Sequence, residues 1–174
     1  TYDNQGNLYA GGIAFGMGYP VTTGAYQTTF GGGGGGGAFS PIDISISKFA
    51  SAGTVLLYST YVGGNGNEQP HSLVCNDLDE LYIYGKTYSA NYPVTAGAYD
   101  VTYNGGADMI VSKLSVNGAI MLGSTFVGGA GDDGVNINST TFSSSSLKRN
   151  YGDDSRGDIA TFANGNCVVA SCTQ

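Results

Sequence analysis

The chain alternates short bursts of β-branched and aromatic residues with turns that are rich in Gly, Asn, Asp and Pro. Residues 42–47 show the pattern most clearly, because isoleucine occupies the even positions and aspartate or serine the odd ones. Such a period of two places the isoleucines on one face of an extended strand. Val, Ile, Thr and Tyr, which are enriched in strands, recur throughout, and no long run of good helix formers occurs. The pattern predicts an all-β fold.

Four strands are expected in the middle of the chain, separated by turn signals. They cover residues 71–75, 81–87, 109–115 and 120–127. Asn117 and Gly118, between the last two strands, form the strongest short hairpin signal available. Four antiparallel strands joined in chain order are typical of one blade of a β-propeller. We therefore expect β-propeller-type, four-stranded antiparallel blades.

An internal repeat organises the sequence. The block YPVTTGAY at Tyr19–Tyr26 returns as YPVTAGAY at Tyr92–Tyr99, an offset of 73 residues. The block STYVGG from Ser59 returns as STFVGG from Ser124, an offset of 65 residues. The difference between the offsets places an insertion at the run Gly31–Gly37, which is expected to be a flexible connector. Because a single sheet cannot bury both of its faces, each unit is expected to stack on its neighbours.

The repeat predicts about two and a half blades of an incomplete ring. Residues 1–75 would hold blade 1, without its inner strand, and the inner strand of blade 2. Residues 76–136 would complete blade 2, residues 137–156 would form a Ser/Thr-rich insertion loop, and residues 157–174 would supply the first two strands of blade 3. Propellers close with about four to eight blades. The chain is therefore expected to be an excerpt of a longer protein or a subunit that completes itself against partners.

These blocks carry a likeness to a known family. GNLYAGG, ISKF, LLYSTYVGG, ELYIYGKT, GGADMIVSKL and STFVGGAGDD, with the two Tyr-Pro-Val-Thr blocks, resemble the SBBP β-propeller repeat of large secreted bacterial proteins, many from the Bacteroidota. The likeness covers nearly the whole chain apart from the glycine run and the Ser-rich insertion. It implies an extracellular or cell-surface scaffold or adhesion segment of a larger protein, often one exported by type IX secretion.

The resemblance leaves the partner and the exact role open. It implies a protein or glycan partner at the cell surface, or further blades of the same or a neighbouring chain. One alternative is a self-associating structural subunit whose open blades pair with other copies. Another is a secreted glycan-active enzyme. These hypotheses belong to different classes, and fold alone does not decide among them.

Charge excludes two classes of partner. Thirteen acidic and six basic side chains give a formal charge of −7 and a pI near 4.2. The chain therefore lacks the basic footprint that a nucleic acid or an anionic membrane attracts. Its apolar runs are far shorter than the roughly 20 residues that span a bilayer, so no membrane insertion is expected.

Catalytic chemistry finds little support in the sequence. His71 is the only histidine, and a lone histidine at the start of a strand is usually structural. The carboxylate pairs Asp132–Asp133 and Asp153–Asp154 are formed by adjacent residues, which point to opposite sides of an extended chain. We therefore expect no enzyme activity and no bound cofactor.

A calcium site is one interpretation of the segment Gly128–Val135, which fits the nonapeptide GGxGxDxUx of calcium-binding β-rolls. Its candidate ligands are Asp132, Asp133 and Asn136. Calcium requires six to eight oxygen ligands, and no second nonapeptide follows. The other interpretation is a tight turn that joins the outer strand of one blade to the inner strand of the next.

Three further groups of residues could serve structure or recognition. The tyrosines have both interpretations, and the acidic cluster and the cysteines have a structural one. The recurring tyrosines of the Tyr-Pro-Val-Thr blocks form either a structural clasp in each blade or a recognition surface. The acidic cluster Asp77, Asp79 and Glu80 is expected to be a solvated turn. The three cysteines match no zinc or redox motif and are expected to be buried as small hydrophobic residues; they are Cys75, Cys167 and Cys172.

Overall fold

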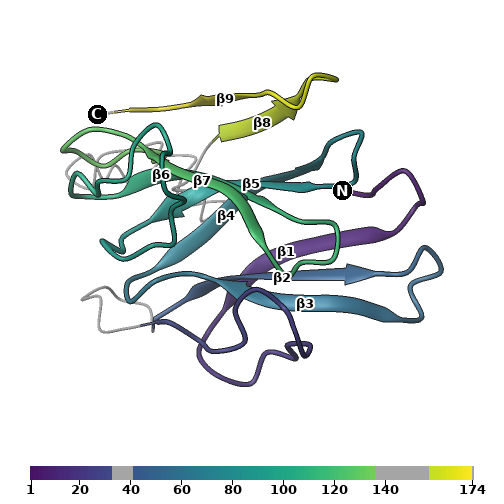
Figure 1. Cartoon of the computed structure of the whole chain (residues 1–174). Coiled ribbons are helices and arrows are strands. Elements are labelled where there is room, and N and C mark those ends of the chain that lie inside the picture. Colours follow the sequence, from purple (N-terminus) through teal and green to yellow (C-terminus); the bar gives the residue numbers. More distant parts are fainter. Residues whose placement is uncertain (33–40, 136–156, 174) are drawn as a thin grey trace, which may run out of the picture.

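The computed structural model describes residues 1–32, 41–135 and 157–173, and these residues form three antiparallel sheets with no helix (Figure 1). The first sheet has the order β1–β2–β3, the second β4–β5–β6–β7, and the third β8–β9. The strands are β1 (Leu8–Ala14), β2 (Asp43–Phe49), β3 (Leu56–Val62), β4 (Glu68–Cys75), β5 (Leu81–Thr87), β6 (Asp108–Leu114), β7 (Met121–Val127), β8 (Gly157–Thr161) and β9 (Cys167–Ser171). The all-β prediction is confirmed.

The four expected strands of the second sheet are present, with one clear difference in length. β5 has the predicted bounds, whereas β4 begins at Glu68, three residues before the expected start. The extra residues Glu68, Gln69 and Pro70 show no apolar alternation, so the sequence pattern does not mark them as a strand. They pair in register with Thr87, Lys86 and Gly85 of β5, which supplies the missing partner.

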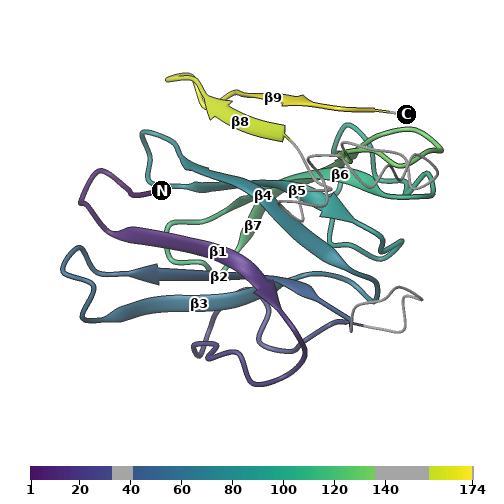
Figure 2. The same cartoon turned by 180° about the vertical axis from the view of Figure 1, so that it is seen from behind.

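The sheets are stacked as three layers, with the second sheet between the other two (Figures 1 and 2). On β5 of the second sheet, alternate side chains enter the cores on opposite faces, as the period of two requires. The first core joins the first and second sheets and contains Tyr9, Ile44, Ile46, Tyr58, Val62, Leu81, Ile83, Tyr92, Ile110, Leu114 and Phe126. The second core joins the second and third sheets and contains Tyr82, Tyr84, Met109 and Ile159. Within the described ranges the three sheets do not close into a ring.

The β6–β7 turn connects neighbouring sheets as well as neighbouring strands. Gly118 adopts a φ of 68°, which favours glycine, and its carbonyl accepts a hydrogen bond of 2.8 Å from the backbone N–H of Tyr26. The turn also lies directly against the ring of Tyr58 on β3. The β6–β7 hairpin of the second sheet therefore packs against the first sheet.

Candidate functional site

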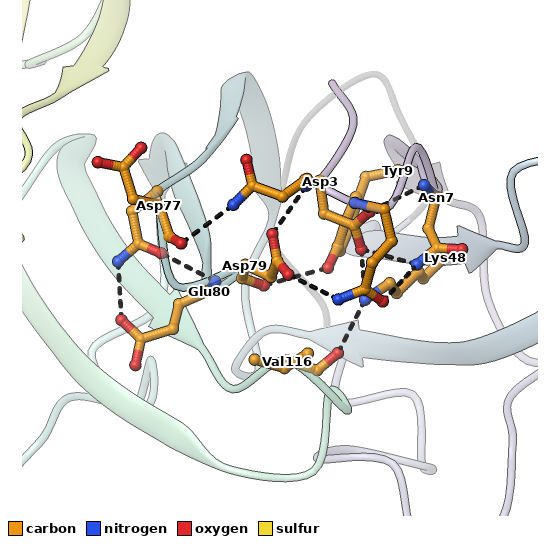
Figure 3. A network of polar contacts seen from close by, with 11 residues as sticks. Asp3, Asn7, Tyr9, Lys48, Asp77, Asp79, Glu80 and Val116 are labelled. Atoms are coloured by element: carbon orange, nitrogen blue, oxygen red, sulfur yellow. Dashed lines mark hydrogen bonds and ion pairs between the residues drawn. The ribbon is translucent and has the colours of Figure 1, made fainter.

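Polar residues gather at both ends of the junction between the first and second sheets. At one end lies the lysine network, formed by Asp3, Asn4, Gln5, Asn7, Tyr9, Lys48, Asp79 and Val116 (Figure 3). At the opposite end of β2 lies the acid pair, formed by Asp43 and Glu68. Both groups link residues of different sheets. They therefore determine how one sheet docks on the next.

Lys48 is the centre of the lysine network, and only 4% of its surface is exposed. Its Nζ lies 2.9 Å from Asp3 Oδ2, donates to the carbonyl of Val116 at 3.3 Å, and sits 4.9 Å from the centre of the Tyr9 ring (Figure 3). Val116 belongs to the β6–β7 turn of the second sheet. One buried ammonium group therefore bridges the two sheets.

Asp79 completes the network from the second sheet. Its carboxylate accepts hydrogen bonds from the backbone N–H of Asn4 at 2.8 Å and from Gln5 Nε2 at 2.9 Å, while its carbonyl accepts one from the Tyr9 hydroxyl at 3.3 Å. Its φ of 61° lies in the left-handed region, which aspartate tolerates better than most residues. Only 8% of Asp79 is exposed, so the expectation of a solvated turn is wrong at this position.

The second unit repeats the lysine contact with acid and amide exchanged. In the first unit Asn7 Nδ2 donates to Asp3 Oδ2 at 2.9 Å, and Asp3 pairs with Lys48. Asn76 occupies the position equivalent to Asp3, and Glu80 that of Asn7, at the offset of 73. Asn76 Nδ2 donates to Glu80 Oε2 at 2.8 Å, and Glu80 pairs with Lys113 at 3.0 Å. The acid and the amide thus swap positions between the two units, and in both units the acid pairs with the equivalent lysine.

Hydrogen bonds set the charge state of both acids. Burial favours the neutral form, but the hydrogen bonds from Lys48 and Asn7 outweigh it and lower the pKa of Asp3. In the same way, the hydrogen bonds from Asn76 and Lys113 outweigh burial and lower the pKa of Glu80. Both acids are therefore held as carboxylates at neutral pH, and each lysine keeps its partner.

The acid pair occupies the other end of β2, around Gly63. A Cβ atom on Gly63 would lie 2.5 Å from Glu68 Oε2 and 2.9 Å from Asp43 Oδ1, so the two oxygens are no more than about 5.4 Å apart, the sum of these distances. Both acids are fully buried. Only glycine leaves room for two carboxylates at this point.

The same arrangement occurs in the second unit around Gly128. There a Cβ atom would lie 2.6 Å from Asp133 Oδ2 and 2.8 Å from Asp108 Oδ1. Asp108 and Asp133 are the equivalents of Asp43 and Glu68 at the offset of 65, and they too are fully buried. Burial raises the pKa of Asp108, and the nearby Asp133 raises it further. A pair of buried acids around the glycine that follows β3 or β7 is thus a repeated feature of the fold.

The Tyr-Pro-Val-Thr blocks lie along the edge strands β3 and β7. Tyr92 is buried, and its hydroxyl is hydrogen-bonded to Ser112 Oγ at 2.9 Å, which in turn is hydrogen-bonded to Ser124 Oγ at 2.8 Å. Thr95 Oγ1 accepts a hydrogen bond of 3.0 Å from the backbone N–H of Ser124. Tyr19, Ser47, Ser59 and Thr22 repeat this set of bonds in the first sheet. These contacts favour the clasp interpretation for both blocks.

The candidate calcium ligands are placed only in part. Asp132 Oδ1 accepts a hydrogen bond from the Ala107 backbone N–H at 3.0 Å, and Asp133 Oδ2 accepts one from the Gly129 N–H at 2.6 Å. Asn136 lies outside the described residues. Among the residues that the structure describes, no group of three or more His, Cys, Asp or Glu side chains is arranged to hold a metal ion. Calcium binding at this loop stays a prediction, and the contacts of Asp132 and Asp133 are those of a tight turn.

The remaining candidate residues are dispersed over the fold. The ring of His71 packs edge-on against Tyr84, with 5.2 Å between the ring centres. Cys75 and Cys167 are half-buried beside the two cores, but Cys172 is exposed, so the expectation of burial is wrong for that cysteine. Asp153 and Asp154 lie outside the described residues, as do the greater part of the glycine run and the predicted insertion loop at 137–156.

Comparison with known proteins adds no relative. No protein-family model matches the chain, and no curated protein matches it significantly. In the ranges that the structure covers, no helix has the length and apolar character needed to cross a membrane.

Proposed function

We propose that this chain is a segment of an extracellular or cell-surface bacterial β-propeller, whose sheets are consecutive blades of a non-enzymatic scaffold or adhesion module. The observation that carries the proposal is the repeated junction. Tyr9 and Lys48 face the second sheet from the first, with the ammonium over the ring at 4.9 Å. Tyr82 and Lys113 repeat this contact on the next face at 5.5 Å. A module that stacks identical faces in succession is the construction principle of propellers and solenoids.

An unequal pair of tyrosines supports the presence of further blades. Tyr26 of the first unit is half-buried, because the β6–β7 hairpin of the second sheet covers it and Gly118 accepts its backbone N–H. Tyr99 is its equivalent in the second unit and is 90% exposed. A hairpin of a third complete blade would cover Tyr99 in the same manner. The likeness to the SBBP repeat points in the same direction.

The structure of the native, full-length protein that contains these residues tests the proposal. We expect cryo-electron microscopy to show the three sheets as neighbouring blades around one axis, with β4 and β8 nearest that axis and a further hairpin over Tyr99. A linear stack of sheets, or a helical body outside them, would contradict the propeller. Protease treatment of intact producing cells should release peptides of this chain if it lies at the surface, and their absence beside a digested surface control would contradict the location.

Self-association is the second candidate, and the exposed Tyr99 face favours it equally. The mass of the native gene product separates the two. A chain many blades long supports the scaffold, whereas a product of 17.7 kDa that elutes as an oligomer supports completion by other copies. If the purified protein hydrolysed members of a panel of glycans and His71→Ala lost this activity, the result would contradict both the scaffold and the self-associating subunit and would indicate an enzyme.

A further inference from the structure

The acid pair brings two carboxyl groups close to Gly63 in the interior. Asp43 comes from β2 of the first sheet and Glu68 from β4 of the second, so the pair spans the junction. Neither residue has any exposed surface. Their oxygens Oδ1 and Oε2 both lie within 3 Å of the space above Gly63. Two like charges this close in a dry site repel each other strongly.

Hydrogen bonds satisfy three of the four carboxyl oxygens. Glu68 Oε1 accepts from Thr87 Oγ1 at 2.6 Å and from Ser89 Oγ, and Glu68 Oε2 accepts from the Gly64 N–H at 3.2 Å. Asp43 Oδ2 accepts from the Gly31 N–H at 2.8 Å. Asp43 Oδ1 is buried and has no hydrogen-bond partner in the described part of the chain. This orphaned oxygen lies beside Gly63, as Glu68 Oε2 does.

Among the residues that the structure describes, no basic side chain faces the pair from the elements packed around it. On β5 the residue in register with Glu68 is Thr87, and Lys86 alternates onto the opposite face of the strand, where it lies near the Tyr88 ring. His71 lies farther along β4, against Tyr84 in the second core.

The loops around the pair contribute neutral groups. Tyr92, in the loop after β5, is close enough for the Glu68 charge to act on it, and burial raises the pKa of its phenol, so it stays neutral. The loop before β2 contributes the Gln27 side chain, whose Nε2 is 3.4 Å from Asp43 Oδ2. A carboxylate pair in such surroundings needs a positive partner between its oxygens.

We propose that Asp43 and Glu68 share one proton, which joins the first and second sheets, and that loss of this proton at alkaline pH loosens this end of the junction. The protonated carboxyl donates to the other, which satisfies Asp43 Oδ1 and removes the repulsion. A metal ion would need six to eight oxygens. In the described ranges no third acidic, His or Cys side chain joins the pair as a ligand. The equivalent placement of Asp108 and Asp133 around Gly128 shows that the geometry is part of the repeat.

The sign of the pH effect follows from the buried acid. Burial, and then the Asp43 charge, raise the pKa of Glu68 from 4.5 to about 7. Between these values the folded chain binds more protons than the unfolded chain, so stability falls as the pH rises. Above pH 7 both states are deprotonated, and the loss is complete. The shift corresponds to an unfolding constant that rises by roughly two orders of magnitude between pH 4.5 and pH 8.

Carboxyl ¹³C NMR titration of the unmodified chain is the direct test, because it needs no variant that must fold. We expect Glu68 and Asp43 to titrate together, with a coupled step near neutral pH. Glu68→Gln then provides an isosteric neutral partner whose amide can donate to Asp43 Oδ1. Its urea unfolding midpoint should fall less between pH 5 and 8 than that of the parent, and the slope that remains belongs to the equivalent pair Asp108 and Asp133.

Glu80→Gln is the matched control. It removes an acid that pairs with Lys113 and whose pKa is lowered, so the slope between pH 5 and 8 should persist. The proposal would be overturned if the carboxyl groups of Asp43 and Glu68 both titrated with the pKa values of ordinary exposed acids. It would also be overturned if the urea midpoint of Glu68→Gln fell with pH as steeply as that of the parent. Saturable stabilisation by calcium chloride at pH 8, lost in Glu68→Gln, would also overturn it, because a cation and not a proton would then lie between the two carboxyl groups.

Discussion

Lys48 gives the sharpest test of how the sheets are joined, and Lys48→Met is the change that isolates it. Methionine keeps the length of the apolar stem but removes the ammonium, which lies 2.9 Å from Asp3 Oδ2. The Lys48 and Asp3 side chains are 5% and 0% exposed. Removal of one member of a buried ion pair leaves the other charge in a dry site and costs about 3–5 kcal/mol. Asp3 keeps hydrogen bonds from Asn7 Nδ2 and from the Gln5 N–H, so we expect the lower end, about 3 kcal/mol.

The second unit supplies the control within the same molecule. Lys113→Met breaks the equivalent contact with Glu80 at 3.0 Å, but these side chains are 27% and 18% exposed. Solvent screens such a pair, and the expected loss is about 1 kcal/mol. Urea unfolding at pH 7, followed by circular dichroism, measures both variants against the parent. Equal losses for the two lysines would refute the argument, because burial is the main difference between the two contacts.

Acid titration adds a second signature of the same pair. Because the folded-state pKa of Asp3 is lowered, its contribution is present at neutral pH and is lost as the pH falls through that pKa. Lys48→Met should therefore flatten the acid limb of the stability curve. The double variant Lys48→Met with Asp3→Asn should recover part of the loss, because the orphaned charge is gone. No recovery would mean that the ammonium acts through Val116 or Tyr9 instead.

Two further changes test the core and the clasp. Ile46→Ala, at a fully buried position between the first two sheets, should cost about 2–5 kcal/mol in urea unfolding. Leu57→Ala, at a position 46% exposed on β3 of the same sheet, should change stability by no more than about 1 kcal/mol. Ser112→Ala removes the partner of the buried Tyr92 hydroxyl and should cost about 1–3 kcal/mol, with faster amide exchange at Thr95 and Ser124. A loss confined to the global stability, with no local change in exchange, would argue against the clasp.

The strands were predictable because apolar and polar residues alternate along them and because glycine and asparagine occupy the turns between them. The β6–β7 hairpin follows from Asn117 and Gly118, and the structure has it. The start of β4 at Glu68 was not predictable, because its pairing is dictated by the neighbouring β5 and not by its own composition. Tertiary partners override local pattern where a strand segment is polar.

The acid pair is visible in the sequence as acids at equivalent positions of the two units. Asp43 and Asp108 are separated by the repeat offset of 65, and so are Glu68 and Asp133. Acids kept at equal positions of two units indicate a shared structural environment. The partner of Lys48 leaves no such mark, because the acid is Asp3 in one unit and the equivalent of Asn7, Glu80, in the other. Only the folded geometry shows that each acid reaches the lysine of its own unit, Asp3 reaching Lys48 and Glu80 reaching Lys113.

The two ends of the junction respond to pH in opposite directions. Protonation of Asp3 at low pH removes the charge that binds Lys48, and deprotonation of the acid pair at high pH sets two buried carboxylates against each other. The free energy of unfolding should therefore peak at mildly acidic pH, between the lowered pKa of Asp3 and the value of about 7 for Glu68. If the free energy of unfolding of the parent chain stayed constant up to pH 9, deprotonation of the acid pair would not destabilise the fold. A peak that moves to higher pH in Glu68→Gln, but not in Glu80→Gln, would assign part of the alkaline loss to Asp43 and Glu68, the rest belonging to the equivalent pair Asp108 and Asp133.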